Sequence, residues 1–101
     1  MTEKSTEIQE VFQHRLDVTL KISQLNALHL QHSQRLMGVR LDVQRCADNV
    51  HENTADAALR AEYAQSKALE ARLISEMEQC DAERREFERE VEKLDRQLTA
   101  L

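Results

Sequence analysis

The sequence contains no proline, no tryptophan and a single glycine, Gly38. Glycine and proline are the strongest local interruptions of regular secondary structure, so very little here interrupts a helix. Only three of the 101 residues are aromatic, and 33% are charged. The rest is rich in Ala, Glu, Leu, Gln and Arg, a composition typical of long helices. A chain of this length also leaves little room for a closed catalytic pocket.

Long apolar runs are also missing, and none approaches the roughly 18 residues of a transmembrane helix. The net charge of −5 does not favour nucleic acid or an anionic membrane as a partner. The first residues show no signal-peptide pattern, and Cys46 and Cys80 lack metal-binding or redox spacing. We therefore expect a cytoplasmic protein with no cofactor, no bound metal and no membrane span.

The first half of the chain carries a heptad seam, in which apolar residues recur at alternating steps of three and four. This seam predicts one helix from about residue 5 to 50, with Ser5 or Thr6 as its N-cap. Its apolar members are Ile8, Val11, Val18, Ile22, Leu25, Leu36, Val39, Val43, Cys46 and Val50.

A second apolar row lies on the same helix, roughly 100° around from the heptad seam. A helix that is apolar on two faces needs two neighbours, and the rest of the chain supplies one strong seam. We expect the second row to bind a protein partner or another copy of the chain. Its members are Phe12, Leu16, Leu20, Leu30, Met37 and Leu41, together with Ala27.

The cluster of turn-prone residues at 48–54 predicts a turn at about 51–54 and a second helix from about 55 to 101. Asn53, followed by Asp56, resembles a capping pattern for this helix. The second helix carries one seam, which Ser66, Glu70 and Arg84 interrupt. Its apolar members are Leu59, Tyr63, Leu73, Met77, Cys80, Phe87, Val91, Leu94, Leu98 and Leu101.

These patterns predict an all-α fold, a long antiparallel helical hairpin of the coiled-coil type, with residues 1–101 in one domain. Two alternatives remain open at this point. One is a three-helix bundle with an additional break near Gly38. The other is a dimeric four-helix bundle, in which two hairpins cover each other's second apolar row.

Two histidines, His29 and His32, occupy seam positions where a coiled coil ordinarily has Leu or Ile. A turn near residue 52 places them roughly opposite Leu73, Met77 and Cys80, and also near Glu76. We interpret the pair as a polar layer that sets helix register, with a pH-responsive layer as the alternative. Three-residue spacing within one helix does not favour a metal site.

Arg15 also lies in the seam, roughly opposite Glu90 in the same hairpin. Cys80 is expected near Leu25, far along the helix axis from Cys46. Because a disulfide needs Cα atoms within about 7 Å, the two cysteines are expected to be separate buried thiols.

No catalytic motif is visible: there is no phosphate-binding loop, nucleophile elbow, zinc-protease helix or cysteine knuckle. We therefore expect a non-enzymatic protein-interaction module, a small coiled-coil adaptor or assembly subunit that binds partner helices. The alternative is a small helical chaperone that shields an apolar surface of a client.

The segment from Leu59 to Leu98 resembles the later helices of tubulin-binding cofactor A, a small all-helical chaperone. The resemblance lies in the order of Arg72-Leu-Ile, Cys80 and Arg84-Arg-Glu-Phe-Glu-Arg-Glu-Val-Glu-Lys-Leu, with gaps between these blocks. The first helix lacks the basic pattern of that family. The resemblance implies a helical bundle that captures β-tubulin.

Overall fold

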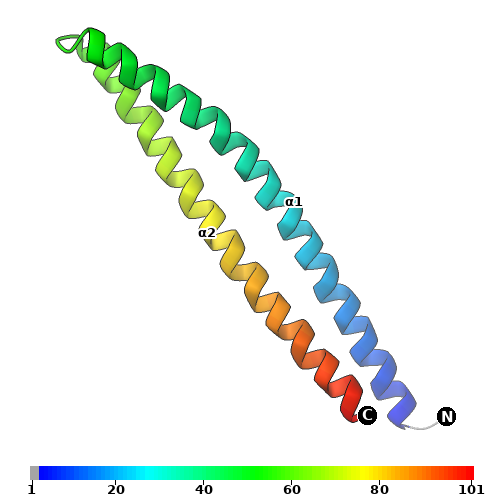
Figure 1. Cartoon of the computed structure of the whole chain (residues 1–101). Helices are drawn as coiled ribbons and strands as arrows, with labels where there is room; N and C mark the ends of the chain where they lie inside the picture. Colours follow the sequence, from blue (N-terminus) through cyan, green and yellow to red (C-terminus); the bar gives the residue numbers. More distant parts are fainter. Residues whose placement is uncertain (1–2) are drawn as a thin grey trace. The chain divides into compact units, whose positions relative to one another are not determined.

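The structure, a computed structural model, describes residues 3–101 and is built from two long helices (Figure 1). Helix α1 spans Glu3–Glu52 and helix α2 spans Ala57–Ala100. No strand occurs between residues 3 and 101. The predicted all-α fold is therefore confirmed.

Helix α1 passes through Gly38 without a break, so the three-helix alternative is wrong. One glycine costs only about 1 kcal/mol relative to alanine, which a long packed helix tolerates. Ser5 and Thr6 lie inside α1 rather than at its N-cap. Their weak helix propensity costs about 0.5 kcal/mol each, which is too little to stop the helix at these residues.

The turn occupies residues 53–56, two residues later than expected. Asp56, rather than Asn53, is the N-cap of α2. Its carboxylate accepts hydrogen bonds from the backbone N–H groups of Ala58, at 2.9 Å, and Leu59, at 3.2 Å. These two N–H groups have no acceptor inside the helix, so the Asp56 carboxylate satisfies them. Its negative charge is also stabilised by the positive end of the helix dipole.

The chain divides into two compact units. The turn unit is His29–Gln79, and the end unit joins the described residues up to Leu28 to Cys80–Leu101. In each unit a segment of α1 packs antiparallel against a segment of α2, so the fold is a helical hairpin.

The turn unit has a core of three buried side chains, Leu36, Val39 and Leu73. Leu73 is completely buried. Burial of one such side chain stabilises a fold by about 1.5–3 kcal/mol. Four partly buried apolar residues surround this core: Val43, Leu69, Ile74 and Met77.

The end unit buries Val18, Cys80 and Leu94. Its antiparallel arrangement is visible in two contacts between α1 and α2. The Nζ atom of Lys21 lies 5.4 Å from the centroid of the Phe87 ring, a cation–π contact. Nearer the N-terminus, Arg15 contacts Asp95.

All members of the predicted seam on α1 are buried or half-buried, as are those on α2. We call these two rows the inner seam. Heptad spacing was therefore sufficient to identify the packed face of each helix.

Candidate functional site

The surface of α1 carries the main candidate site, which we call the outer stripe: Phe12, Leu16, Leu20, Leu30, Met37 and Leu41. All six side chains are exposed, from 52% for Phe12 to 73% for Leu41. Phe12, Leu16 and Leu20 belong to the end unit, and Leu30, Met37 and Leu41 belong to the turn unit. Ala27, in the same row, is exposed as well.

The outer stripe is specific to one helix. Among the described residues, every large apolar side chain that is exposed lies on α1. The equivalent outward positions of α2 carry alanine near the turn and charges farther along, such as Arg85, Arg89 and Glu92. The outward face of α2 therefore exposes small and charged side chains, whereas that of α1 exposes large apolar ones.

The outer stripe lies farther from the inner seam than the expected 100°. When the inner seam holds heptad positions a and d, five of its six residues hold positions b and f, about 150° away in a 3.5-residue repeat. Phe12 is the exception, at position e. Positions b and f point away from the helix partner, which explains why these side chains are exposed.

One exposed apolar residue, Leu28, was not predicted; it is 40% exposed. It follows Ala27 directly and lies at heptad position g, beside the inner seam. A search for three- and four-residue steps passes over such a flanking position.

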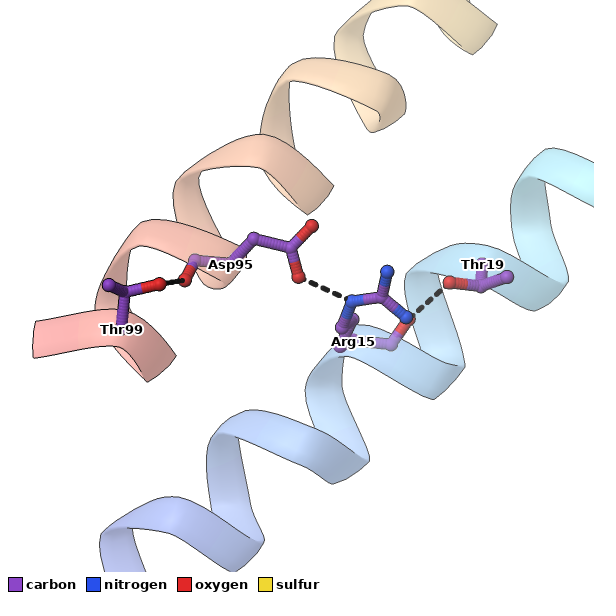
Figure 2. Close-up of polar contacts among 4 residues, drawn as sticks. All are labelled: Arg15, Thr19, Asp95 and Thr99. Carbon is purple, nitrogen blue, oxygen red and sulfur yellow. Dashed lines mark hydrogen bonds and ion pairs between the residues drawn. The ribbon is translucent and has the colours of Figure 1, made fainter. Parts of the chain in front are cut away.

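Arg15 and Asp95 form the shortest ion pair described between the two helices (Figure 2). Nε of Arg15 donates a hydrogen bond to Oδ1 of Asp95 at 2.6 Å. This hydrogen bond, followed by the Coulombic attraction, raises the pKa of Arg15 above its ordinary value. The guanidinium is therefore charged at neutral pH.

The prediction that Arg15 lies opposite Glu90 was wrong, because Arg15 contacts Asp95. Oε1 of Glu90 instead lies 3.9 Å from Nε2 of His14. The reason is the position of the turn. Because the turn lies two residues later than expected, Arg15 meets Asp95, which lies five positions after Glu90 on α2.

The histidine layer faces an acidic side chain, as expected. Nε2 of His32 lies 3.7 Å from Oε2 of Glu76, and the His32 side chain is 17% exposed. Its other ring nitrogen, Nδ1, is buried without a hydrogen-bond partner in the described structure. His32 therefore introduces a polar group that the seam satisfies only in part.

The two cysteines are free and buried, as predicted. Sγ of Cys80 donates a hydrogen bond to the carbonyl oxygen of Leu25 at 3.3 Å, which confirms the expected neighbour. Burial raises the pKa of the Cys80 thiol, and the neighbouring Asp81 and Glu83 raise it further. A thiol that resists ionisation is a poor nucleophile and metal ligand, so this side chain acts as a core residue.

Within residues 3–101 there is no group of three or more His, Cys, Asp or Glu side chains able to hold a metal ion. Over the same residues, no helix combines the length and the apolar character that crossing a membrane requires.

The outer stripe is thus the set of large apolar side chains that α1 leaves exposed in the described structure. Comparisons with protein-family models, with curated proteins and with solved structures give no match for this chain.

Proposed function

We propose that this chain is a non-enzymatic protein-interaction module, a small coiled-coil adaptor or assembly subunit. In this proposal the outer stripe of α1 binds an α-helix of a partner protein. The inner seam holds the hairpin together and so presents the stripe on a preformed scaffold.

The observation that carries the proposal is the exposure of the six outer-stripe side chains, each more than half exposed. Large contiguous apolar patches on water-exposed surfaces mark interaction sites. Covering one leucine of this kind contributes up to about 1.5–3 kcal/mol. A few such residues are therefore sufficient for a specific complex, after the cost of association is subtracted.

The form of the surface favours a helix over a small molecule. Small-molecule sites are concave and bury most of the ligand. The outer stripe follows one side of helix α1, with three large apolar residues in the end unit and three in the turn unit. A partner helix matches this repeat, because its own side chains pack between those of the stripe.

A client-shielding chaperone of the tubulin-binding cofactor A type is the second proposal. The resemblance over Leu59–Leu98 and the open apolar stripe both support it. The two proposals differ in the ligand: an adaptor binds one folded helix in fixed stoichiometry, whereas a chaperone binds its client before the client is folded.

The cytoplasm is the compartment we propose. Both cysteines are buried free thiols, and thiols persist in reducing compartments.

Site-specific photocrosslinking tests the proposal. A photoreactive amino acid is placed at Leu20 or Met37, and the matched controls carry it at Ala64 or Ala68, which are exposed on α2. The proteins are irradiated in the cells that produce the chain, and mass spectrometry locates each adduct. Adducts concentrated at the two stripe positions and mapped to a helical segment support the proposal. Equal labelling at all four positions, or none, rejects it.

A variant pair provides a second test. Leu16→Asp/Leu20→Asp is expected to abolish association while circular dichroism retains the helical signal. The control Ala64→Asp/Ala68→Asp has the same four-residue spacing and is expected to leave association unchanged. An unchanged mass or complex for the stripe variant removes the stripe from consideration.

A further inference from the structure

Five of the six outer-stripe residues, all except Phe12, belong to a longer row on α1. Starting at Gln9, positions at alternating steps of four and three residues continue to Asp48, and we call this row the outer seam. Every member is exposed, and every member before Asp48 is uncharged. On α2 the corresponding outward row contains five charged residues. α1 therefore carries a second row at heptad spacing, half of it apolar, which the hairpin does not use.

A strict repeat of four and three is the packing pattern of a left-handed coiled coil. A ligand that packs on the outer seam in this way is itself a helix with a heptad repeat. Helix α1 itself meets this requirement, because its exposed row has the heptad repeat and is uncharged before Asp48.

We propose that the outer seam binds the outer seam of a second copy of this chain, with the two α1 helices antiparallel. The inference rests on the proposed function and names the partner. The product is a four-helix assembly in which the two α1 helices lie at the centre and each α2 lies outside.

The order of residues in the outer seam supports the antiparallel arrangement. From either end, the row begins with two polar residues and continues with two large apolar residues. Leu16 then lies opposite Leu41 of the second copy, and Leu20 lies opposite Met37 of the second copy. Large apolar residues thus pack together near both ends of the contact. Between them a small side chain faces a longer one, which allows the two helices to interdigitate. These inner pairs are Ser23 with Gln34 of the second copy and Ala27 with Leu30 of the second copy.

The charges beside the outer seam favour the same orientation. In an antiparallel pair, Glu10 lies beside Arg45 of the second copy, and symmetry forms this contact twice. Both side chains are exposed and able to reach a partner.

A parallel pair in register has the opposite electrostatics. It places Arg40 beside Arg45 of the second copy, again twice, and leaves Glu10 without a cation. Arg40 already lies 3.7 Å from Glu70 on its own α2, which reduces this repulsion without giving the parallel pair any attraction. Like charges at these flanking positions select against an orientation.

Disulfide trapping tests both the partner and the orientation. Ser23→Cys and Gln34→Cys are prepared separately, and both positions are exposed. In the antiparallel pair, the two copies of residue 23 are about 16 Å apart along the axis at 1.5 Å per residue, too far for a disulfide. The same separation applies to the two copies of residue 34. Wild type under the same oxidant controls for the buried Cys46 and Cys80.

The expected result is a rapid disulfide-linked dimer when the two variants are mixed, and crosslinking at least about tenfold slower for each variant alone. Efficient crosslinking of each variant with itself indicates a parallel pair and overturns the proposal. Absence of crosslinks in the mixture, with both variants retaining the wild-type helical signal, overturns it as well.

Charge exchange provides an independent measurement. Glu10→Arg and Arg45→Glu are each expected to raise the dissociation constant of the dimer about tenfold, because each replaces two attractions by two repulsions. Mixing the two variants restores every opposite-charge contact and is expected to restore the dimer. Light scattering coupled to gel filtration at about 50 µM measures the mass, expected to be twice the 11.7 kDa of one chain.

Failure of this inference is distinguishable from failure of the proposed function. A chain that is monomeric in light scattering but forms adducts at Leu20 with a helix of another protein retains the proposed function and rejects the second copy. A monomer with no preference for stripe adducts rejects both.

Discussion

Arg15 on α1 and Asp95 on α2 are joined by a 2.6 Å hydrogen bond between the two helices of the end unit. A short contact of this kind need not stabilise the fold much. Both side chains are substantially exposed, at 37% and 50%, and exposed pairs contribute little because water screens them.

Arg15→Met keeps most of the aliphatic stem and removes the charge, so we expect only a small decrease in the melting temperature. The decrease should shrink further at high salt, since the lost interaction is Coulombic. A double-mutant cycle with Asp95→Asn, followed by thermal melts at two salt concentrations, measures the coupling. A decrease as large as that caused by Leu73→Ala contradicts the assignment of this pair as exposed.

Leu73→Ala is expected to lower the free energy of unfolding by about 2–5 kcal/mol, because it opens a cavity around a completely buried side chain. Urea denaturation followed by circular dichroism measures the change. Gln65→Ala, an exposed substitution in the same unit, is the control and should change stability by less than about 0.5 kcal/mol.

His32→Leu is expected to raise the free energy of unfolding by about 1 kcal/mol. The substitution removes the buried Nδ1 atom without a hydrogen-bond partner and adds apolar packing. His51→Leu, at an exposed position near the end of α1, is the control. If His32→Leu instead lowers stability, the contact with Glu76 is worth more than the burial cost of the imidazole.

Asp56→Ala is expected to destabilise the protein by about 1 kcal/mol, because two N–H groups at the start of α2 lose their acceptor. Asp56→Asn retains a side-chain oxygen and should restore most of the loss. Chemical denaturation compares the variants with Asn53→Ala. A larger effect of Asn53→Ala identifies Asn53 as the residue whose side chain matters.

The Cys80 thiol is expected to resist alkylation at pH 8.5, where an ordinary cysteine is about half ionised. Burial raises its pKa in the folded protein, so the folded state holds the proton more tightly than the unfolded state. The resulting stabilisation is complete below the unfolded pKa and is lost as pH rises through the folded pKa.

Iodoacetamide labelling measured by mass spectrometry, with and without urea, tests this expectation. Modification of Cys80 in the folded protein at neutral pH, at the rate seen in urea, contradicts it.

The inner seam and the exposed stripe were accessible from the sequence because a period of 3.5 residues reports directly on helix faces. The heptad pattern identified Val18 and Leu94 as packed, and it identified Leu16 and Met37 as lying on a different face. The prediction that Cys80 is a free thiol near Leu25 came from the same heptad pattern.

The partner of Arg15 was not predicted correctly because it depends on the turn, where no periodicity operates. Asn53 and Asp56 are both good capping residues, and Asp56 is the one that caps α2. Arg15 meets Asp95, five residues after the expected Glu90. The resemblance to tubulin-binding cofactor A stays a prediction.

The turn at residues 53–56 uses ordinary backbone conformations, and no residue in the described range 3–101 has a positive φ angle. All four turn residues are exposed. The reversal of the chain is consequently enforced by the inner seam and the Asp56 cap, not by a specialised loop. A fluorescent protein or affinity tag inserted between Thr54 and Ala55 should therefore be accommodated, since insertion there interrupts neither helix. Such an insertion provides a way to label the protein in living cells without modifying either helix.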